Sequence, residues 1–307
     1  MENVVDVVII GAGPAGLSAG IYGLRAGLTL QVLERGVAGG QVQSTYEVDN
    51  YPGLPGISGM DLSGKMKEHF EKLGGTLTNA EVIKVTKEGE GAFSVETDKG
   101  TFHSKAVLLA AGAHHAKLGV PGEEELAGCG VSYCATCDGA FYKGAVTAVI
   151  GGGNVAVEDA IFLAKFCEKV YLIHRRDSLR ADKTLQDTLF TLPNVEVVWD
   201  STVESMNGDG ELESLTVKNS KTGLGQELAV EGAFIAVGIL PDTERFKDLA
   251  ETDEAGYFLA GEDGITKTAG VFVAGDARKK PLRQILTAAA DGANAITSAA
   301  EYCRQFT

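Results

Sequence analysis

The sequence predicts an α/β fold made of two similar units, the second of which is inserted into the first. Two short apolar segments, residues 5–10 and 146–150, are each followed at once by a glycine-rich turn and a helical pattern. A further buried strand and a helix rich in small residues close the chain after residue 270. With 307 residues, the chain is long for one domain and long enough for two, each with its own core.

The first unit runs from a buried strand to an acidic residue. Residues 5–10, VDVVII, form a continuous apolar run that is typical of a strand buried on both faces. The motif GAGPAG at 11–16 follows, then a helical pattern and a second apolar strand that ends at Glu34. This order is the Rossmann-like dinucleotide-binding pattern. Because a carboxylate accepts hydrogen bonds from ribose hydroxyls and repels a 2′-phosphate, the unit is expected to hold FAD or NAD.

The second unit repeats the pattern with a different ending. GGGNVA at 151–156 forms the turn, and the strand after the helix ends at His174-Arg175-Arg176, with Arg180 four residues on. Arginines donate forked hydrogen bonds to phosphate, so this unit is expected to prefer NADP over NAD. A solvated basic face is the alternative for the arginines. A turn that only packs a helix against a strand is the alternative for either glycine motif.

Segments between and after the units supply the remaining elements. Asp61 is expected to cap a helix that carries Leu62, Met66, Phe70 and Leu73 on one face. Further strands are expected at residues 77–85, 93–97, 106–110, 234–237 and 271–274, and a final helix at 281–302.

An insertion is the simplest topology for these elements. Residues 1–116 and 242–307 are expected to form a discontinuous FAD-binding domain. Residues 117–241 are expected to form an NADPH-binding domain that also carries a cysteine pair. The chain then crosses twice between the domains, and both crossings contain glycine and proline, so a hinge is expected there.

Composition excludes several classes of function. The net charge of −15 argues against a nucleic-acid-binding protein, which needs a basic face for the phosphates. No apolar run approaches the roughly 20 residues that span a bilayer, so no membrane association is expected. The chain begins with a strand-like segment and shows no signal-peptide pattern, which favours the cytoplasm.

The segment SYCATCDG at 132–139 carries the most reactive chemistry. A Cys-x-x-Cys pair can ligate a metal, form a structural disulfide, or cycle between dithiol and disulfide. A zinc site normally needs four ligands, and no second cysteine pair exists among the five cysteines, so no metal is expected. An odd number of cysteines in a reducing compartment also disfavours a structural disulfide.

Several motifs together resemble those of the low-molecular-weight thioredoxin reductases, a family of flavin-dependent disulfide oxidoreductases. The resemblance extends from about residue 4 to residue 304. Its motifs are GAGPAGLSA at 11–19, GGQ at 39–41, DNYPG at 49–53, CATCDG at 134–139, GGGN at 151–154, HRRDSLRA at 174–181 and GDARKKPLRQILTAAADG at 275–292.

The resemblance implies FAD and NADPH as cofactors and assigns residues to each. The residues implied for FAD are Gly11, Gly13, Pro14, Ala15, Gly16, Glu34, Arg35, Gly40, Gln41, Asn50, Val82, Ala111, Gly112, Gly275, Asp276, Arg283, Gln284 and Ile285. Those implied for NADPH are Gly151, Gly153, Asn154, Val155, Ala156, His174, Arg175, Arg176 and Arg180. For the final helix, simple core packing is the alternative to contact with FAD.

The same resemblance implies a catalytic role for three residues. Cys137 faces the flavin and exchanges electrons with it, Cys134 attacks the disulfide of thioredoxin or a thioredoxin-like protein, and Asp138 protonates the departing thiolate. A turn residue before Gly139 is the alternative for Asp138. The family also implies a homodimer and a rotation of the inserted domain that lets either the cysteines or the nicotinamide meet the flavin.

Some features depart from the family or have no role in it. Val155 stands where many relatives have a hydroxyl side chain, and Ala111 where many have threonine. His114 and His115 are expected to be exposed near the first crossing. Cys129, Cys167 and Cys303 are expected to be unreactive core or surface thiols. The basic segment 278–280 is a candidate for steering a partner.

Three other functions compete with thioredoxin reduction. A flavin reductase component of a peroxide-reducing system would usually carry an extra N-terminal redox region. A ferredoxin-type NADP reductase would leave Cys134 and Cys137 without a role. A non-catalytic, FAD-binding redox sensor would not need the full set of nucleotide, thiol and acid positions.

Overall fold

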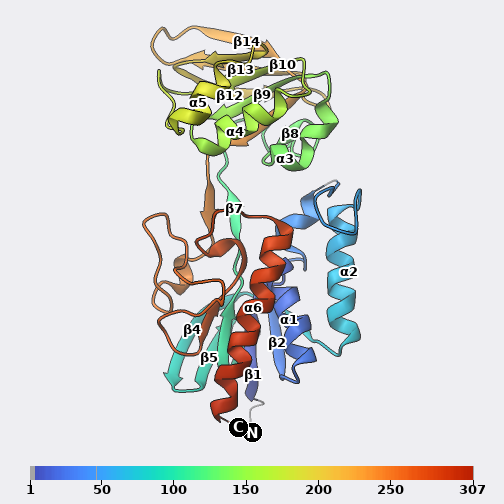
Figure 1. Cartoon of the computed structure of the whole chain (residues 1–307), viewed down its shortest axis with the longest axis vertical. Helices are drawn as coiled ribbons and strands as arrows, with labels where there is room; N and C mark the ends of the chain where they lie inside the picture. The colour runs from blue at the N-terminus through green and yellow to red at the C-terminus, as the bar shows by residue number, and fades with distance from the viewer. Residues whose placement is uncertain (1–3, 46, 307) are drawn as a thin grey trace. The chain divides into compact units, whose positions relative to one another are not determined.

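The computed structural model describes residues 4–45 and 47–306, which form two compact units. The first unit is Met1–His114 with Leu240–Thr307, and the second is His115–Ile239 (Figure 1). Each crossing point therefore lies two residues earlier in the chain than the expected boundaries after residues 116 and 241.

A mixed sheet forms the centre of the first unit. Its order is β3-β2-β1-β6-β5-β4, and β17 pairs with the end of β6 beyond β5. The strands are β1 (Val4–Ile10), β2 (Leu30–Glu34), β3 (Leu77–Asn79), β4 (Val82–Gly89), β5 (Ala92–Thr97), β6 (Gly100–Leu109) and β17 (Val271–Val273). The pairs of β1 with β2 and β6 are parallel, whereas β4, β5 and β6 pair antiparallel.

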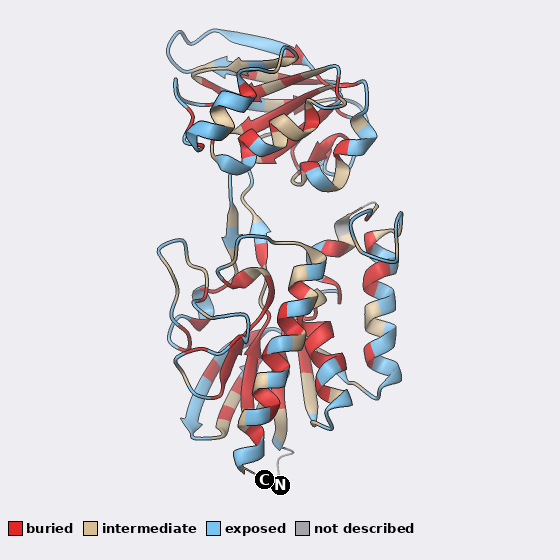
Figure 2. Ribbon diagram, in the orientation of Figure 1, coloured by how far each residue is buried: buried red, intermediate tan, exposed pale blue. Residues whose placement is uncertain are grey.

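Both faces of this sheet are buried, as the apolar run 5–10 predicts. Val7 and Ile9 belong to the core on one face, and Val8 and Ile10 to the core on the other. Successive side chains of a strand point to opposite faces, so an uninterrupted apolar run fits a strand covered on both sides. The buried residues therefore follow the sheet through the unit (Figure 2).

Helices α1 (Pro14–Arg25) and α6 (Ile285–Cys303) pack side by side on this sheet (Figure 1). Their backbones approach closely, since a Cβ atom on Gly292 would lie 2.0 Å from the carbonyl oxygen of Ala15. The small residues of the final helix thus serve close packing. Helix α6 begins at Ile285, four residues after the expected start.

Helix α2 (Gly59–Lys72) corrects one sequence-based expectation. Its N-cap is Ser58, whose side chain accepts a 3.0 Å hydrogen bond from the backbone N–H of Asp61. Asp61 lies within the first turn, where its carboxylate accepts a 2.8 Å hydrogen bond from Ser58. The prediction that Asp61 caps the helix is therefore wrong, because the serine three residues earlier takes that position.

The second unit contains a parallel sheet of order β11-β10-β9-β15-β8. Its strands are β8 (Val131–Ser132), β9 (Val146–Gly151), β10 (Lys169–Ile173), β11 (Val195–Val198) and β15 (Gly232–Ala236). Its helices are α3 (Ala135–Asp138), α4 (Asn154–Leu163) and α5 (Lys183–Leu189). Ala148 and Val149 again belong to cores on opposite faces, as the apolar run 146–150 predicts.

A separate antiparallel sheet of order β12-β13-β14 completes the second unit. Its strands are β12 (Ser201–Asn207), β13 (Ser214–Asn219) and β14 (Gly225–Ala229). One of its faces packs on the main sheet, where Leu215 and Val217 join the same core as Ile150. Strands were expected in the segment before residue 234, but the sequence did not place them, because they are short and their alternation is interrupted between Val203 and Ser205.

Two short strands, β7 (Ala113–His115) and β16 (Ile239–Pro241), pair with each other where the chain crosses between the units (Figure 1). The two crossings are thus one two-stranded ribbon. Among the residues that the structure describes, no helix has the length and apolar character needed to cross a bilayer.

Candidate active site and dinucleotide turns

The cysteine pair lies in a tight turn after the edge strand β8. Cys134 is the N-cap of α3, and both Cys137 and Asp138 donate backbone hydrogen bonds to its carbonyl oxygen. The two sulfur atoms form a disulfide with an S–S distance of 2.09 Å. Among the described residues, no group of three or more potential metal ligands occurs.

Asp138 directly follows Cys137 and is half-buried. Its Oδ2 accepts a 2.6 Å hydrogen bond from the hydroxyl of Ser132, and the same hydroxyl accepts a 3.1 Å hydrogen bond from the backbone N–H of Cys134. Burial raises the pKa of Asp138, and the hydrogen bond from Ser132 opposes that shift. A carboxyl group with a raised pKa beside a disulfide can donate a proton to a leaving thiolate.

Glu123 anchors the segment that leads to the cysteines, a role that the sequence did not reveal. Its side chain is only 1% exposed. It accepts hydrogen bonds from the backbone N–H groups of Leu118 and Gly119, at 3.0 and 2.6 Å, and from the hydroxyl of Tyr133 at 2.8 Å. The motif VPGE at 120–123 resembles a surface turn, and only the fold shows that its acid is buried.

The two histidines near the first crossing differ in their environments. His114 is exposed, as expected, and its Nδ1 lies 3.1 Å from Oδ1 of Asp242. His115 is half-buried, because its ring stacks on that of Tyr133 with a centroid distance of 5.4 Å. The expectation that both are exposed is therefore wrong for His115.

The glycine turn of the first unit is tightly packed at Gly16 and open at Gly13. A Cβ atom on Gly16 would lie 1.8 Å from the carbonyl oxygen of Gly11, so this glycine permits close packing of helix on strand. A Cβ atom on Gly13 would meet nothing within 4 Å. The open space at Gly13, directly before the N-terminus of α1, fits a phosphate held by backbone N–H groups.

Glu34 ends β2 beside this turn, as the pattern predicts. Its carboxylate accepts 2.8 Å hydrogen bonds from the backbone N–H groups of Ala12 and Gly36. Glu34 therefore ties the glycine turn to the second strand, and its remaining lone pairs suit ribose hydroxyls. The adjacent Arg35 is exposed and lies 3.6 Å from the carboxylate of Asp242.

Residues from distant parts of the first unit meet at the start of α6. The side-chain amide of Asn50 donates a 2.9 Å hydrogen bond to Oε1 of Gln284, which is the N-cap of α6. Arg283 donates to the carbonyl oxygen of Asp276 at 3.2 Å. The fold thus brings together four residues expected to contact FAD.

The remaining residues expected at FAD lie along the same strand ends. Gly112 and Gly275 both have positive φ, at 76° and 78°, in the turns after β6 and β17. Val82 is buried, whereas Gly40 and Gln41 are exposed in a short 3₁₀ helix after the glycine turn. The others occupy these same segments: Pro14 and Ala15 in α1, Ala111 after β6, and Ile285 at the start of α6.

The basic segment 278–280 is not a docking surface. The side chains of Arg278 and Lys280 are buried and pair with Asp291 at 2.8 and 3.2 Å. Lys280 also lies 3.1 Å from Oδ1 of Asp276. Only Lys279 is exposed, so the expectation that this segment steers a partner is wrong. Asp291, which sequence reasoning missed, instead organises the loop that carries Asp276.

The second glycine turn repeats the geometry of the first. A Cβ atom on Gly153 would meet nothing within 4 Å, as at Gly13. His174 is buried beneath the turn, because a Cβ atom on Gly152 would lie 2.2 Å from its ring. Burial lowers the pKa of His174, which favours its neutral form. His174 therefore supports the turn from below.

Polar residues of the second unit are arranged around this turn. Asn154 and Asp182 exchange two hydrogen bonds of 2.8 and 2.9 Å, which hold the loop before α5 against the start of α4. Arg175, Arg176 and Arg180 are exposed, and no carboxylate among the described residues forms an ion pair with them. Free guanidinium groups beside the turn fit a 2′-phosphate. Val155 is exposed and Ala156 is buried in the first turn of α4.

The other three cysteines form no disulfide. Cys167 and Cys303 are buried, and burial raises the pKa of both thiols. Cys129 is exposed and forms no disulfide. These environments agree with the expectation of unreactive core or surface thiols.

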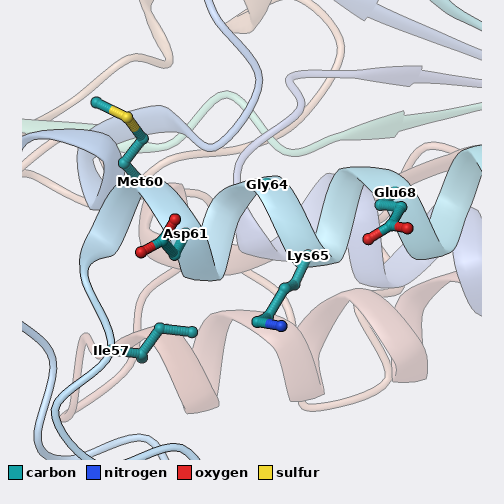
Figure 3. Close-up of a pocket in the computed structure, with 6 residues that line it drawn as sticks. All are labelled: Ile57, Met60, Asp61, Gly64, Lys65 and Glu68. Atoms are coloured by element: carbon teal, nitrogen blue, oxygen red, sulfur yellow. The ribbon is translucent and has the colours of Figure 1, made fainter.

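A surface pocket along α2 belongs to neither dinucleotide turn. Its lining consists of Ile57, Met60, Asp61, Gly64, Lys65 and Glu68 (Figure 3). None of the residues expected at the cofactors or the cysteine pair takes part in it. Its charged residues, Asp61, Lys65 and Glu68, lie on helix α2 and come from neither glycine turn nor the cysteine segment.

The chain is similar over nearly its whole length to known proteins. The family model described as pyridine nucleotide-disulphide oxidoreductase matches residues 5–292. A thioredoxin reductase of Bacillus subtilis is 43% identical to this chain, and the match covers 99% of this chain and 96% of the relative. A thioredoxin reductase of Listeria innocua is 44% identical, with 99% of this chain and 95% of the relative covered. The crystal structure of a thioredoxin reductase from Streptococcus pyogenes matches with a TM-score of 0.92 and 41% identity, and all of both chains is covered.

Proposed function

The chain belongs to the pyridine nucleotide-disulphide oxidoreductase family, and on this premise we propose how its residues carry out the reaction. It is a thioredoxin reductase, an NADPH-dependent oxidoreductase that uses FAD. The observation that carries this function is the Cys134–Cys137 disulfide. In the sequence it stands between the two glycine turns, in a chain similar over its full length to thioredoxin reductases.

The two glycine turns hold different cofactors. In the first unit, Gly13, Glu34, Asp276, Arg283 and Gln284 would hold FAD, with Glu34 available to ribose hydroxyls. The second unit binds NADPH at Gly153, with its three exposed arginines at the 2′-phosphate. When bound, FAD would supply the two-electron chemistry that links NADPH to the disulfide. A hinge at the β7–β16 ribbon lets the inserted unit rotate between the two half-reactions.

The reduced cysteine pair reduces the partner in two exchanges. The Cys134 thiolate attacks one sulfur of the thioredoxin disulfide, and the second partner sulfur leaves as a thiolate. The Cys137 thiolate then attacks Sγ of Cys134, which re-forms the enzyme disulfide and expels the remaining partner sulfur. Asp138 gives its proton to a departing thiolate and becomes a carboxylate, which regains a proton from solvent.

The exposed arginines separate this function from a ferredoxin-dependent one. A ferredoxin-flavin thioredoxin reductase of Clostridium acetobutylicum shares the fold at 29% identity and a TM-score of 0.54. In this chain, Arg175, Arg176 and Arg180 form a cationic site that suits a phosphorylated nucleotide, and a ferredoxin donor does not need such a site. NADPH is therefore the electron donor supported by the geometry.

The state of the protein in solution completes the proposal. We propose a homodimer in the cytoplasm, with thioredoxin or a thioredoxin-like protein as the partner. Sedimentation equilibrium at micromolar concentration is expected to give twice the 32.1 kDa mass of the chain. A monomer that retains full activity would contradict the dimer without affecting the proposed chemistry.

The decisive experiment measures NADPH oxidation with FAD-loaded enzyme and oxidised thioredoxin. Cys134→Ser and Cys137→Ser are expected to abolish thioredoxin reduction, and Asp138→Asn to slow it about 100-fold, which is within the usual worth of a general acid. Cys129→Ser removes an exposed free thiol of the same unit and is expected to retain full activity. Activity without thioredoxin, or full activity of Cys134→Ser, would refute the mechanism.

A further inference from the structure

We propose that Ser132 is a positioning residue that holds the transferable proton of Asp138 on Oδ1. This inference rests on the proposed role of Asp138 as the proton donor. Ser132 ends β8, two residues before Cys134, and is only 7% exposed. Its backbone is fixed by the parallel pairing of β8 with β15, where Ser132 lies opposite Phe234. The hydroxyl therefore projects from a rigid strand end.

The hydroxyl of Ser132 has one proton and three polar neighbours. The backbone N–H of Cys134 donates to it at 3.1 Å, so the serine oxygen acts as an acceptor there. Its own proton has two possible acceptors, Oδ2 of Asp138 at 2.6 Å and the carbonyl oxygen of Cys134 at 3.5 Å. Because hydrogen bonds weaken steeply with distance, the proton goes to Oδ2.

The second oxygen of Asp138 is in a different position. Oδ1 is buried and has no hydrogen-bond partner among the described residues. When the carboxyl group is protonated, Oδ2 already accepts the proton of Ser132 and serves as the carbonyl oxygen. The acidic proton therefore lies on Oδ1, where no hydrogen bond within the protein retains it.

This arrangement gives the transfer a defined direction. A departing thiolate takes the proton from Oδ1 and becomes a thiol, and Asp138 becomes a carboxylate. The hydrogen bond from Ser132 to Oδ2 then stabilises the negative charge, because hydrogen bonds to ionised acceptors are stronger than those to neutral ones. Ser132 thus makes Asp138 a better proton donor, whereas burial alone would hold the proton more tightly.

Removal of the hydroxyl tests this role. Ser132→Ala is expected to lower kcat for thioredoxin reduction about 10-fold. The fall of kcat at high pH, the basic limb of the pH profile, should move upward by about 1 pH unit. Both changes match the usual effect of one hydrogen bond to a charged group. The shift is upward because loss of the hydrogen bond raises the pKa of Asp138, so the group stays protonated to higher pH. Ser132→Thr keeps the hydroxyl and is expected to restore the wild-type limb.

A matched control and a spectroscopic readout exclude a merely structural effect. Ser201→Ala removes another buried serine hydroxyl of the same unit, which donates to the carbonyl oxygen of Trp199 at 2.7 Å, and should leave the limb unchanged. Infrared spectra of the oxidised, FAD-loaded enzyme should contain a C=O stretching band of the protonated Asp138 carboxyl group, which is identified by its loss in Asp138→Asn. In Ser132→Ala this band is expected to move to higher frequency, because the oxygen loses its hydrogen bond. An unshifted band would overturn the proposal even if that variant folded poorly.

Failure of this inference differs from failure of the proposed function. One outcome is that Asp138→Asn slows the reaction while Ser132→Ala changes neither the basic limb of the kcat–pH profile nor the infrared band of Asp138. In that case only the role of Ser132 is wrong. If Asp138→Asn is fully active, the proton donor itself is wrong. In the Asp138→Asn background, Ser132→Ala is expected to cause no further shift of the limb, and an additional shift would contradict the coupling.

Discussion

The hydroxyl of Tyr133 donates a 2.8 Å hydrogen bond to Oε1 of Glu123, a carboxylate that is almost completely buried. Tyr133 directly precedes the reactive Cys134, and Glu123 also holds the backbone that leaves the first crossing. One buried side chain therefore fixes both the start of the second unit and the approach to the cysteine turn.

Loss of this carboxylate is expected to destabilise the second unit. Glu123→Ala leaves backbone N–H groups and the Tyr133 hydroxyl without their acceptor, and should lower the free energy of unfolding by about 2–4 kcal/mol. Urea unfolding measures the difference. Glu124→Ala is the matched control, since that neighbour is exposed and pairs with Lys117 at the surface. Its effect should stay below about 0.5 kcal/mol. Equal effects of the two substitutions would disprove the anchoring role.

The glycines of the first turn should respond differently to the same substitution. Gly13→Ala should fold normally, because its backbone φ of −72° is ordinary and its Cβ position is open, but should lose bound FAD. Gly16→Ala should destabilise the unit by about 3 kcal/mol, because its Cβ collides with the carbonyl oxygen of Gly11. Flavin absorbance per protein and the thermal midpoint separate the two outcomes. A Gly13→Ala protein that keeps its flavin would contradict a pyrophosphate at that position.

Cofactor preference should depend on the exposed arginines. Replacement of Arg175, Arg176 or Arg180 by glutamine should raise KM for NADPH about 10-fold, since each charge-assisted hydrogen bond contributes about 1.5 kcal/mol or more. The same replacements should leave KM for NADH unchanged, because NADH has no 2′-phosphate. Steady-state kinetics with both nucleotides measure this. Lys165→Gln removes an exposed cation elsewhere in the same unit and should change neither value. A parallel rise for NADH would argue against a 2′-phosphate site.

Titration of Asp159 should lower the free energy of unfolding as the pH rises. Burial, with a smaller contribution from Glu158, raises the pKa of Asp159 from 3.8 to about 7. Between these two values the native state binds more protons than the unfolded state, so this group makes the protein less stable as pH rises to about 7 and adds no further change above it.

Asp159→Asn should therefore stabilise the protein at pH 8 by about 1–3 kcal/mol and change little at pH 4. Urea unfolding at the two pH values gives the comparison. Glu158→Gln is the control, because that residue is exposed and supplies only the minor cause of the shift. If Asp159→Asn has the same effect at both pH values, titration of Asp159 is not its cause.

The fold was predictable wherever burial on both faces left a continuous apolar run. The strands at 5–10 and 146–150 and the turns after them are examples. The strands of the β12–β14 sheet were not assigned, because their alternation of buried and exposed residues is short and is interrupted by the register shift between Val203 and Ser205. The cap of α2 was misassigned because Ser58 and Asp61 are both good capping residues, and only the hydrogen-bond geometry distinguishes them.

The residues of the candidate site likewise divide into those that local spacing could locate and those that only the fold brings together. The glycine turns, Glu34 and the cysteine pair could be located from local spacing, since each depends on residues close together in the chain. The contact between Asn50 and Gln284 could not, because these residues are 234 positions apart.

The sequence by itself determined the two nucleotide turns, their acidic and basic endings and the position of the disulfide, because backbone geometry at glycine and the chemistry of cysteine are local properties. The tertiary structure alone decided which polar groups are buried and with which partners. It paired Arg278 and Lys280 with Asp291 and placed Ser132 against Asp138. The charge and proton affinity of such groups depend on desolvation and on neighbours brought together by folding, which no local pattern specifies.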